Sequence, residues 1–247
     1  MNFTILRFNT IESTNTEALN QAARGADEGL CIVARQQTAG RGRHGRVWVS
    51  PPDAGLYFSI VLRPKIKMRF FPLITLMTAI AVHDALETLY DFDCDIKWVN
   101  DIHIHGKKIC GILAEAAETK NGAAIVVGIG INLKSSNFPP EIAEIATSIE
   151  AETKISPDME TLLQKLTANL SQYYDLLGGE SGAEKIRTEW TRRSSYAFGK
   201  PVKVTTENEI ISGATRGIET DGALRVETEN GEIRTIRAGD VENLRAA

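Results

Sequence analysis

The sequence has few cysteines and no long apolar run, and each absence excludes a class of protein. Among 247 residues there are three cysteines, Cys31, Cys94 and Cys110, and none of them is at C-x-x-C spacing. A disulfide framework or a structural zinc site needs more cysteines at regular spacing, so we expect three buried free thiols in a reducing compartment. The N-terminus lacks the apolar core of a signal peptide, and no apolar run approaches the roughly 20 residues that span a bilayer. We therefore expect a cytoplasmic protein with no membrane partner.

Common catalytic motifs are missing as well. The four histidines, His44, His83, His103 and His105, are not at zinc-ligand spacing, and we expect His103 and His105 to lie in a turn. Neither a G-x-S-x-G elbow nor a Walker loop is present, which removes the usual support for a serine hydrolase or a P-loop enzyme. Positive charge is not in excess, because the net charge is −4 and the pI is about 5.7. A surface that binds duplex nucleic acid is therefore not expected.

The apolar pattern predicts an α+β chain with 43% hydrophobic residues, enough for one sizeable domain with a small appendage. Periodicity predicts helices over 15–24, 70–89, 158–177 and 183–191, and strands over 3–8, 30–35, 55–62, 95–99, 108–117 and 123–133. Further on, D-G and N-G turns separate short β-runs over 202–206, 210–216, 223–228 and 232–237. We therefore divide the chain into a mixed-sheet domain over 1–195 and a small β-barrel over 196–247.

The most distinctive stretch is G-R-G-R-H-G-R-V-W, at residues 40–48. Its glycines match the dinucleotide-binding pattern G-x-G-x-x-G, but β-branched residues and a Pro-Pro pair follow them where that motif needs a helix, and no carboxylate stands about 20 residues further on. Arginines among glycines suit a chain that approaches an anionic ligand closely, although a solvated surface loop is an equally good interpretation of this stretch alone. The residues concerned are Gly40, Arg41, Gly42, Arg43, Gly45 and Arg46.

Two other stretches combine polar residues with the ends of predicted strands. K-W-V-N-D places Lys97, Asn100 and Asp101 at the end of one strand, where by themselves they also fit an ordinary turn. V-V-G-I-G-I-N-L places Gly128 and Gly130 on an apolar strand that continues to Asn132. The missing side chains leave room either for a flat ligand or for a closely packed neighbouring strand.

In this order along the chain, these stretches resemble the biotin protein ligase family. The resemblance rests on S-T-N at 13–15, Q-T-A-G-R-G-R-H-G-R-V-W at 37–48, K-W-V-N-D at 97–101, K-I-C-G-I-L-A-E at 108–115 and G-I-G-I-N-L at 128–133. It covers nearly the whole chain and implies a catalytic domain of the biotin/lipoate ligase type with a C-terminal SH3-like β-barrel. Val99 stands where the family usually has proline. With no helix-turn-helix segment before these motifs, we expect the ligase-only form without a DNA-binding domain.

The resemblance implies an enzyme that joins biotin to AMP, using ATP and Mg²⁺, and then passes the biotinyl group to one lysine of a carboxylase's biotin carrier domain. Two anions must meet in the first step, so fixed cations are needed: Lys97 would bridge the biotin carboxyl and the α-phosphate, and Arg43 would hold the phosphate side of the adenylate. The implied biotin-binding residues are Ser13, Thr14, Asn15, Gln37, Gly40, Arg41, Gly42, Lys97 and Gly111. The implied ATP- and adenylate-binding residues are Arg41, Arg43, Arg46, Trp48, Asn100 and Asn132.

Several points stay open. Spacing alone assigns no metal ligands, and Asp101 is only one candidate for the base that deprotonates the acceptor lysine. Relatives are often dimers, so a homodimer is an option.

A lipoate or octanoate ligase or transferase shares the catalytic fold, but an aliphatic chain has no use for so many hydrogen-bonding residues. A non-catalytic nucleotide or nucleic-acid binding module is the alternative of another class, and the seven Lys/Arg and nine Asp/Glu of 196–247, a local charge of −2, argue against it.

Overall fold

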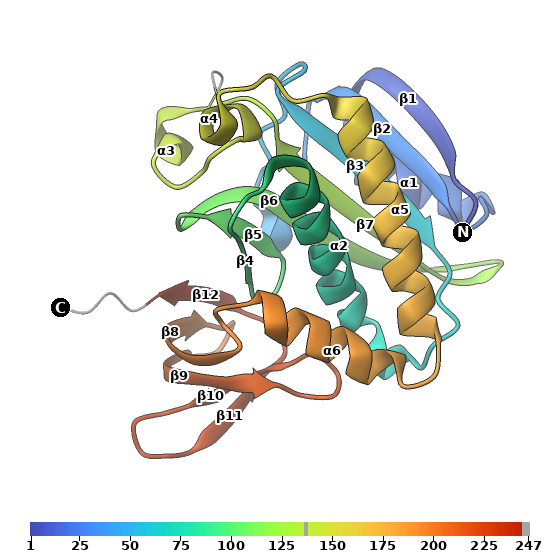
Figure 1. Ribbon diagram of the computed structural model, residues 1–247. Coiled ribbons are helices and arrows are strands. Elements are labelled where there is room, and N and C mark those ends of the chain that lie inside the picture. Colours follow the sequence, from blue (N-terminus) through green and yellow to red (C-terminus); the bar gives the residue numbers. More distant parts are fainter. Residues whose placement is uncertain (136–137, 244–247) are drawn as a thin grey trace.

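The structure, a computed structural model that describes residues 1–135 and 138–243, contains two sheets (Figure 1). The larger has seven strands in the order β1-β2-β3-β7-β6-β5-β4. β1 and β2 pair in parallel, and each later pair of neighbours is antiparallel. Its strands are β1 (Thr4–Ile11), β2 (Leu30–Gln37), β3 (Gly55–Leu62), β4 (Cys94–Lys97), β5 (Asp101–Ile104), β6 (Lys107–Thr119) and β7 (Gly122–Asn132).

The smaller sheet is antiparallel and has five strands in the order β11-β10-β9-β8-β12. It follows the last helix of the chain and lies at one end of the larger sheet (Figure 1). These strands confirm the small all-β unit that the hairpin turns predict, and with the mixed sheet they confirm the α+β fold class. The strands are β8 (Phe198–Thr205), β9 (Ile210–Ile218), β10 (Leu224–Glu227), β11 (Ile233–Ile236) and β12 (Asp240–Asn243).

Helices cover both faces of the larger sheet (Figure 1). α1 packs on one face against β2 and β3, while α2, α5 and α6 form a layer on the other face. Two short helices, α3 and α4, lie in the connection that follows β7. The helices are α1 (Thr14–Ala23), α2 (Pro72–Tyr90), α3 (Pro140–Ala143), α4 (Ile149–Thr153), α5 (Met159–Gly178) and α6 (Gly182–Arg193).

Alternation along the central strands explains why both faces are covered. On β3, Phe58 and Ile60 belong to the main core beneath α2 and α5, whereas Val61 belongs to a smaller cluster beneath α1. β7 repeats the pattern, with Val127 in the main core and Val126 under α1. Because successive strand residues point to opposite faces, a strand that is apolar on both sides needs a partner layer on each side.

Helix α2 is the most apolar helix. Met68–Tyr90 is long and apolar enough to cross a membrane, with a mean hydropathy of 1.4. However, 67% of its apolar window is buried, among the larger sheet, α5 and α6. These features are those of a core helix.

Several local predictions are wrong in instructive ways. The predicted strand 95–99 ends at Lys97, and a further strand, β5, follows almost at once. His103 lies in that strand rather than in a turn, whereas His105 does lie in a turn, with φ of 50°. Ser13 caps α1, since its side chain accepts from the Thr16 N–H, and this leaves the Thr14 hydroxyl available for other contacts.

The buried cysteines are confirmed, because Cys31, Cys94 and Cys110 are all free and buried. The division at residues 195 and 196 stays a prediction. The core of the smaller sheet is continuous with that of the larger domain, and Trp98 Nε1 donates to the Gly222 carbonyl at 3.0 Å.

An ion-pair network joins α2, α5 and α6. Asp84 on α2 accepts from Arg193 on α6 at 2.6 and 2.9 Å and from the Tyr173 hydroxyl on α5 at 2.5 Å. His83, Asp84 and Glu87 lie close enough together to hold a metal ion, but the Asp84 carboxylate is already bound by Arg193. Burial by itself would raise the pKa of Asp84, but hydrogen bonds from His83, Arg193 and Tyr173 outweigh it and hold that pKa well below its ordinary value.

We expect Asp84→Asn to lower the free energy of unfolding by about 1 to 3 kcal/mol at neutral pH, because the buried Arg193 loses a charged partner. A carboxyl with a depressed folded-state pKa contributes stability above its unfolded pKa of about 3.9 and loses that contribution as the pH falls below it. Urea unfolding at pH 7 and pH 3 should therefore show a large difference from wild type that shrinks in acid. Asp175→Asn, at an exposed position on α5, is the control, and an equal effect at both pH values would contradict the account.

Candidate functional site

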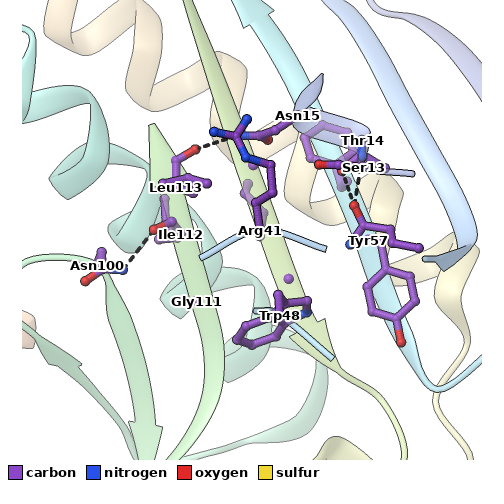
Figure 2. A pocket seen from close by; sticks show the side chains of 15 residues that line it. Ser13, Thr14, Asn15, Arg41, Trp48, Tyr57, Asn100, Gly111, Ile112 and Leu113 are labelled. Carbon is purple, nitrogen blue, oxygen red and sulfur yellow. Dashed lines mark hydrogen bonds between the residues drawn. The ribbon is translucent and has the colours of Figure 1, made fainter. Parts of the chain in front are cut away.

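A polar pocket lies on the α1 face of the larger sheet, beside the N-terminus of that helix (Figure 2). Two larger and more open grooves, of about 490 and 630 Å³, border α5 and α6, but none of the predicted site residues lines them. We therefore take this pocket as the candidate site. It is lined by Ser13, Thr14, Asn15, Gln37, Arg41, Trp48, Tyr57, Phe58, Asn100, Gly111, Ile112, Leu113, Gly128, Ile129 and Gly130.

Glycines form the floor of the pocket. A Cβ on Gly128 would lie 2.1 Å from Asn15 Oδ1, and one on Gly130 would lie 2.4 Å from the Trp48 indole. On the neighbouring strand a Cβ on Gly111 would lie 2.9 Å from the same indole. In Figure 2 Trp48 lies between Gly111 and Tyr57. The glycines therefore make the space that these side chains occupy, which goes beyond close packing of strands.

Hydroxyl and amide groups form a connected network at the inner end. Ser59 Oγ lies 2.6 Å from Asn15 Oδ1 and 2.8 Å from Thr14 Oγ1. Gln37 Oε1 accepts from the Thr14 N–H and hydroxyl at 2.8 and 3.1 Å, and its Nε2 donates to Ser50 at 2.8 Å. Each amide is thus oriented by its neighbours, so the pocket presents polar atoms in defined directions.

The glycine-arginine stretch folds as a small hairpin rather than as the start of a helix. Arg41 and Val47 form an antiparallel bridge, and the Trp48 N–H donates to the Gly40 carbonyl at 2.9 Å. After Gly45, which has φ of +72°, the chain continues extended. The rejection of a dinucleotide-binding turn is therefore confirmed.

Arg41 reaches across the pocket to Glu115 on β6. Its two terminal nitrogens lie 3.0 and 2.7 Å from the two carboxylate oxygens, a bidentate ion pair. Asn15 Nδ2 donates to the same carboxylate at 2.9 Å and to the Leu113 carbonyl at 3.2 Å, the latter drawn in Figure 2. Sequence reasoning quoted Glu115 within a motif but assigned it no role. Alternation from Gly111 through Leu113 is the signal that would have placed it on the pocket face.

The other two arginines of the hairpin are also bound. Arg43 donates to Asn100 Oδ1 at 3.0 Å and to the Gly239 carbonyl at 3.4 Å, and Arg46 pairs with Asp240 of the smaller sheet. Burial lowers the pKa of Arg43, while nearby Asp101 raises it. The hairpin is therefore attached to both sheets.

A row of charged groups continues along β4 and β5 beside the pocket. Lys97 lies directly across from Asp101 in the strand register, and Lys108 Nζ lies 2.7 Å from Asp101 Oδ1. Burial lowers the pKa of Lys97, Asp101 raises it and Lys108 lowers it further. Burial, with a contribution from Lys97, also lowers the pKa of His103 to about 4, so this histidine is neutral at neutral pH.

The structure brings many of the predicted site residues together. Those that line the pocket are Ser13, Thr14, Asn15, Gln37, Arg41, Trp48, Asn100 and Gly111. Gly40, Gly42, Arg43, Arg46, Lys97 and Asn132 lie outside its lining. Asn132 Nδ2 instead donates to the Thr147 carbonyl at 2.9 Å. The ligand roles of all these residues stay predictions.

The pocket is small because Trp48 fills part of it. About 40 Å³ of water-sized space is present, room for only a few atoms. The Trp48 indole lies against the Gly111 and Gly130 positions, so this side chain of the hairpin limits the room in the pocket.

Comparisons with known proteins agree with this geometry. Residues 8–132 match the Biotin/lipoate A/B protein ligase family, and residues 197–242 match the Biotin protein ligase C terminal domain. The bifunctional ligase/repressor BirA of Bacillus spizizenii is 37% identical over 94% of this chain and 71% of its own length. A biotin acetyl-CoA-carboxylase ligase of Mycobacterium tuberculosis is 30% identical over 94% of this chain and 86% of its own length.

Solved structures show the same arrangement. The biotin protein ligase of Aquifex aeolicus in complex with biotin and ATP superposes with a TM-score of 0.84 and 30% identity, covering 98% of this chain and 99% of that one. Both sheets are therefore shared with a structure that holds these two ligands.

We expect Gly130→Ala to displace the Trp48 indole and loosen the hairpin, because the added Cβ would lie 2.4 Å from it. Trypsin should then cut after the hairpin arginines roughly tenfold faster, which corresponds to about 1.4 kcal/mol of lost packing. Limited proteolysis with mass spectrometry measures the rate. Gly178→Ala is the control, since nothing lies within 4 Å of a Cβ there. Equal rates for both variants would show that Trp48 does not seat the hairpin.

Proposed function

Because the chain belongs to the biotin/lipoate A/B protein ligase family, we propose that it is an ATP-dependent biotin protein ligase. It joins biotin to AMP and transfers the biotinyl group to a lysine in the carrier domain of a biotin-dependent carboxylase. The observation that carries the proposal is the polar pocket itself, which sets amides and hydroxyls beside a cation-rich hairpin. A ligand with both a hydrogen-bonding ring and an anionic tail fits this combination.

The inner end of the pocket suits the ureido ring of biotin. That ring has two N–H donors and one carbonyl acceptor, which need partners once they are buried. Ser13, Thr14 and Asn15 are 2 to 4% exposed, and each carries both a polar side chain and a neighbouring partner that orients it. A linear octanoyl or lipoyl chain would leave such groups unpaired at a cost of about 1 to 3 kcal/mol each. This favours biotin over the lipoate alternative.

The outer end suits the activation step. One oxygen of the biotin carboxylate attacks the α-phosphorus, a new O–P bond forms, and the bond to pyrophosphate breaks with its electron pair going to the leaving oxygen. Two anions approach each other, so preorganised cations lower the barrier. We propose that Lys97, at the end of β4, brings the carboxylate and the α-phosphate together. Arg43, held by Asn100, contributes charge from the hairpin.

The hairpin also protects the product. Biotinyl-AMP is a mixed anhydride that water cleaves, so a closed site raises the yield of transfer. The contacts of Arg41 with Glu115 and of Arg46 with Asp240 hold the hairpin down over the strands. The same contacts must break for substrates to enter.

Transfer needs a neutral amine, since the acceptor lysine Nζ attacks the acyl carbon and AMP leaves. A free lysine has a pKa of about 10.4, so a group must accept its proton. Asp101 was one candidate, but Lys108 holds its carboxylate at 2.7 Å.

Mg²⁺ is expected with ATP, but the described residues around the pocket do not form a cage for it. Their carboxylates are already bound, Glu115 by Arg41, Asp101 by Lys108 and Asp240 by Arg46. Mg²⁺ enters nucleotide sites mainly through phosphate oxygens and water, and we propose that it does so here.

Three further expectations remain proposals: a homodimer, a cytoplasmic location and the absence of a nucleic-acid partner. The net charge of −4 supports the last, because phosphate-backbone binding needs a surplus of Lys and Arg.

The direct test is incubation with ATP, Mg²⁺, biotin and an isolated biotin carrier domain, followed by intact mass measurement of the carrier. We expect one biotinyl group per carrier domain, and none when its acceptor lysine is replaced by arginine. Parallel reactions with octanoate and with lipoate, each with a lipoyl carrier domain as acceptor, test the alternative function of a lipoate or octanoate ligase. Modification by those acids but not by biotin would overturn the proposal.

We expect Lys97→Ala to lose most biotinyl-AMP formation, by roughly 10², because a fixed cation is removed from the point where two anions meet. Pyrophosphate release in the presence of biotin and ATP is the measurement, and thermal unfolding checks that the fold survives. Lys185→Ala, at an exposed position on α6, serves as the control. Near wild-type pyrophosphate release would remove Lys97 from the mechanism.

A further inference from the structure

Strand β6 carries a bulge next to the pocket. Ile102 of β5 pairs with Cys110, but the next residue, His103, pairs with Lys108, so Ile109 is an extra residue in β6. Ile109 and Cys110 are both fully buried in the main core on the helix side. A regular strand would point these two neighbours to opposite faces. Bulges of this kind re-aim side chains and are frequent beside active sites.

The bulge turns Lys108 toward the pocket. Residues 108 and 111 are three apart, so in a regular strand they would face opposite sides. Here a Cβ on Gly111 would lie 3.1 Å from both Cε and Nζ of Lys108, which places the lysine on the glycine floor. The Lys108 backbone is held by the Ile145 carbonyl and the Thr147 N–H, each at 2.9 Å. The orientation of Lys108 is thus built into the fold.

The surroundings of the ammonium group indicate what it binds. Lys108 Nζ lies 2.7 Å from Asp101 Oδ1 and 5.5 Å from the centre of the Trp48 ring, and the side chain is 31% exposed. Asp101 also faces Lys97 across the strand pair and lies near Arg43. Three cations therefore lie near two carboxylates, Asp101 and, beside Lys97, Glu242, and an arriving polyanion would balance the remaining positive charge.

We propose that Lys108 is a catalytic residue of the activation step that binds the pyrophosphate end of ATP, exchanging Asp101 for phosphate oxygens. This inference rests on the proposed function. As the bond between the α-phosphorus and the bridging oxygen breaks, the electron pair passes to that oxygen, and the Lys108 ammonium offsets the charge that develops there. No proton needs to move. Because the Lys108 side chain is partly exposed, pyrophosphate bound to it would have a path to solvent.

Measuring biotinyl-AMP formation and biotin transfer separately distinguishes this role of Lys108 from a purely structural one. Lys108→Gln should slow pyrophosphate release from biotin and ATP roughly 10- to 100-fold, as expected for loss of one electrostatic contact. Transfer of biotin from preformed biotinyl-AMP to the carrier domain contains no pyrophosphate and should stay within about twofold of wild type. Lys107→Gln, one residue earlier on β6 and exposed, is the matched control and should leave both half-reactions unchanged.

Direct titration with inorganic pyrophosphate tests the same contact without any ligation. Calorimetry should show weaker binding by about tenfold for Lys108→Gln, partial recovery for Lys108→Arg, and tighter binding for Asp101→Asn, which removes the competing carboxylate. Unchanged pyrophosphate binding in Lys108→Gln, or equal slowing of both half-reactions, would overturn the proposal. A wild-type protein that binds pyrophosphate but makes no biotinyl-AMP would refute the proposed function instead.

Discussion

The site depends on one constraint: a sheet that helices cover on both faces can bind a ligand only where part of one face lacks side chains and is not covered by a helix. Helix α1 covers the face that carries Val61 and Val126, but further along the same strands Gly128 and Gly130 have no side chain to cover. Asn15 and Trp48 occupy the space that the glycines leave. A larger residue at either position would take the space of Asn15 or Trp48. The hydrogen-bonding network and the seat of the hairpin therefore both require these glycines.

Charge balance is the second organising feature. The hairpin arginines are not free cations waiting for a ligand, since Arg41 is bound by Glu115 and Arg46 by Asp240. An anionic ligand that binds these arginines would therefore compete with carboxylates of the protein. Because Asp240 belongs to the smaller sheet, that sheet takes part in the site even though its strands do not line the pocket.

Much of the site could be predicted from sequence because its residues lie in short, unusual stretches. Polar residues at 13–15, the glycine-arginine stretch and Gly111 all line the pocket or border it. The stretches could not show which cationic and anionic residues form ion pairs with each other. Glu115 stood inside a quoted motif with no role: alternation along β6 puts it on the pocket face, but only the fold of the hairpin brings Arg41 to it. The resemblance counts Asn132 among the adenylate-binding residues, and only the structure shows that its amide donates to the Thr147 carbonyl, 15 residues further along the chain.

The sequence by itself determined the fold class, the long core helix, most strand positions and the family, because alternation, helical spacing and rare motifs are local properties that survive without three-dimensional information. The tertiary structure decided what depends on register. β5 was missed because Asp101 and His103 read as turn residues until β4 and β6 pair on either side of them. The face that Lys108 presents was hidden for the same reason, since a bulge shifts the alternation by one residue and no local pattern marks it. Hydrogen bonding between strands that are distant in sequence fixes that shift, and with it the chemistry of the site.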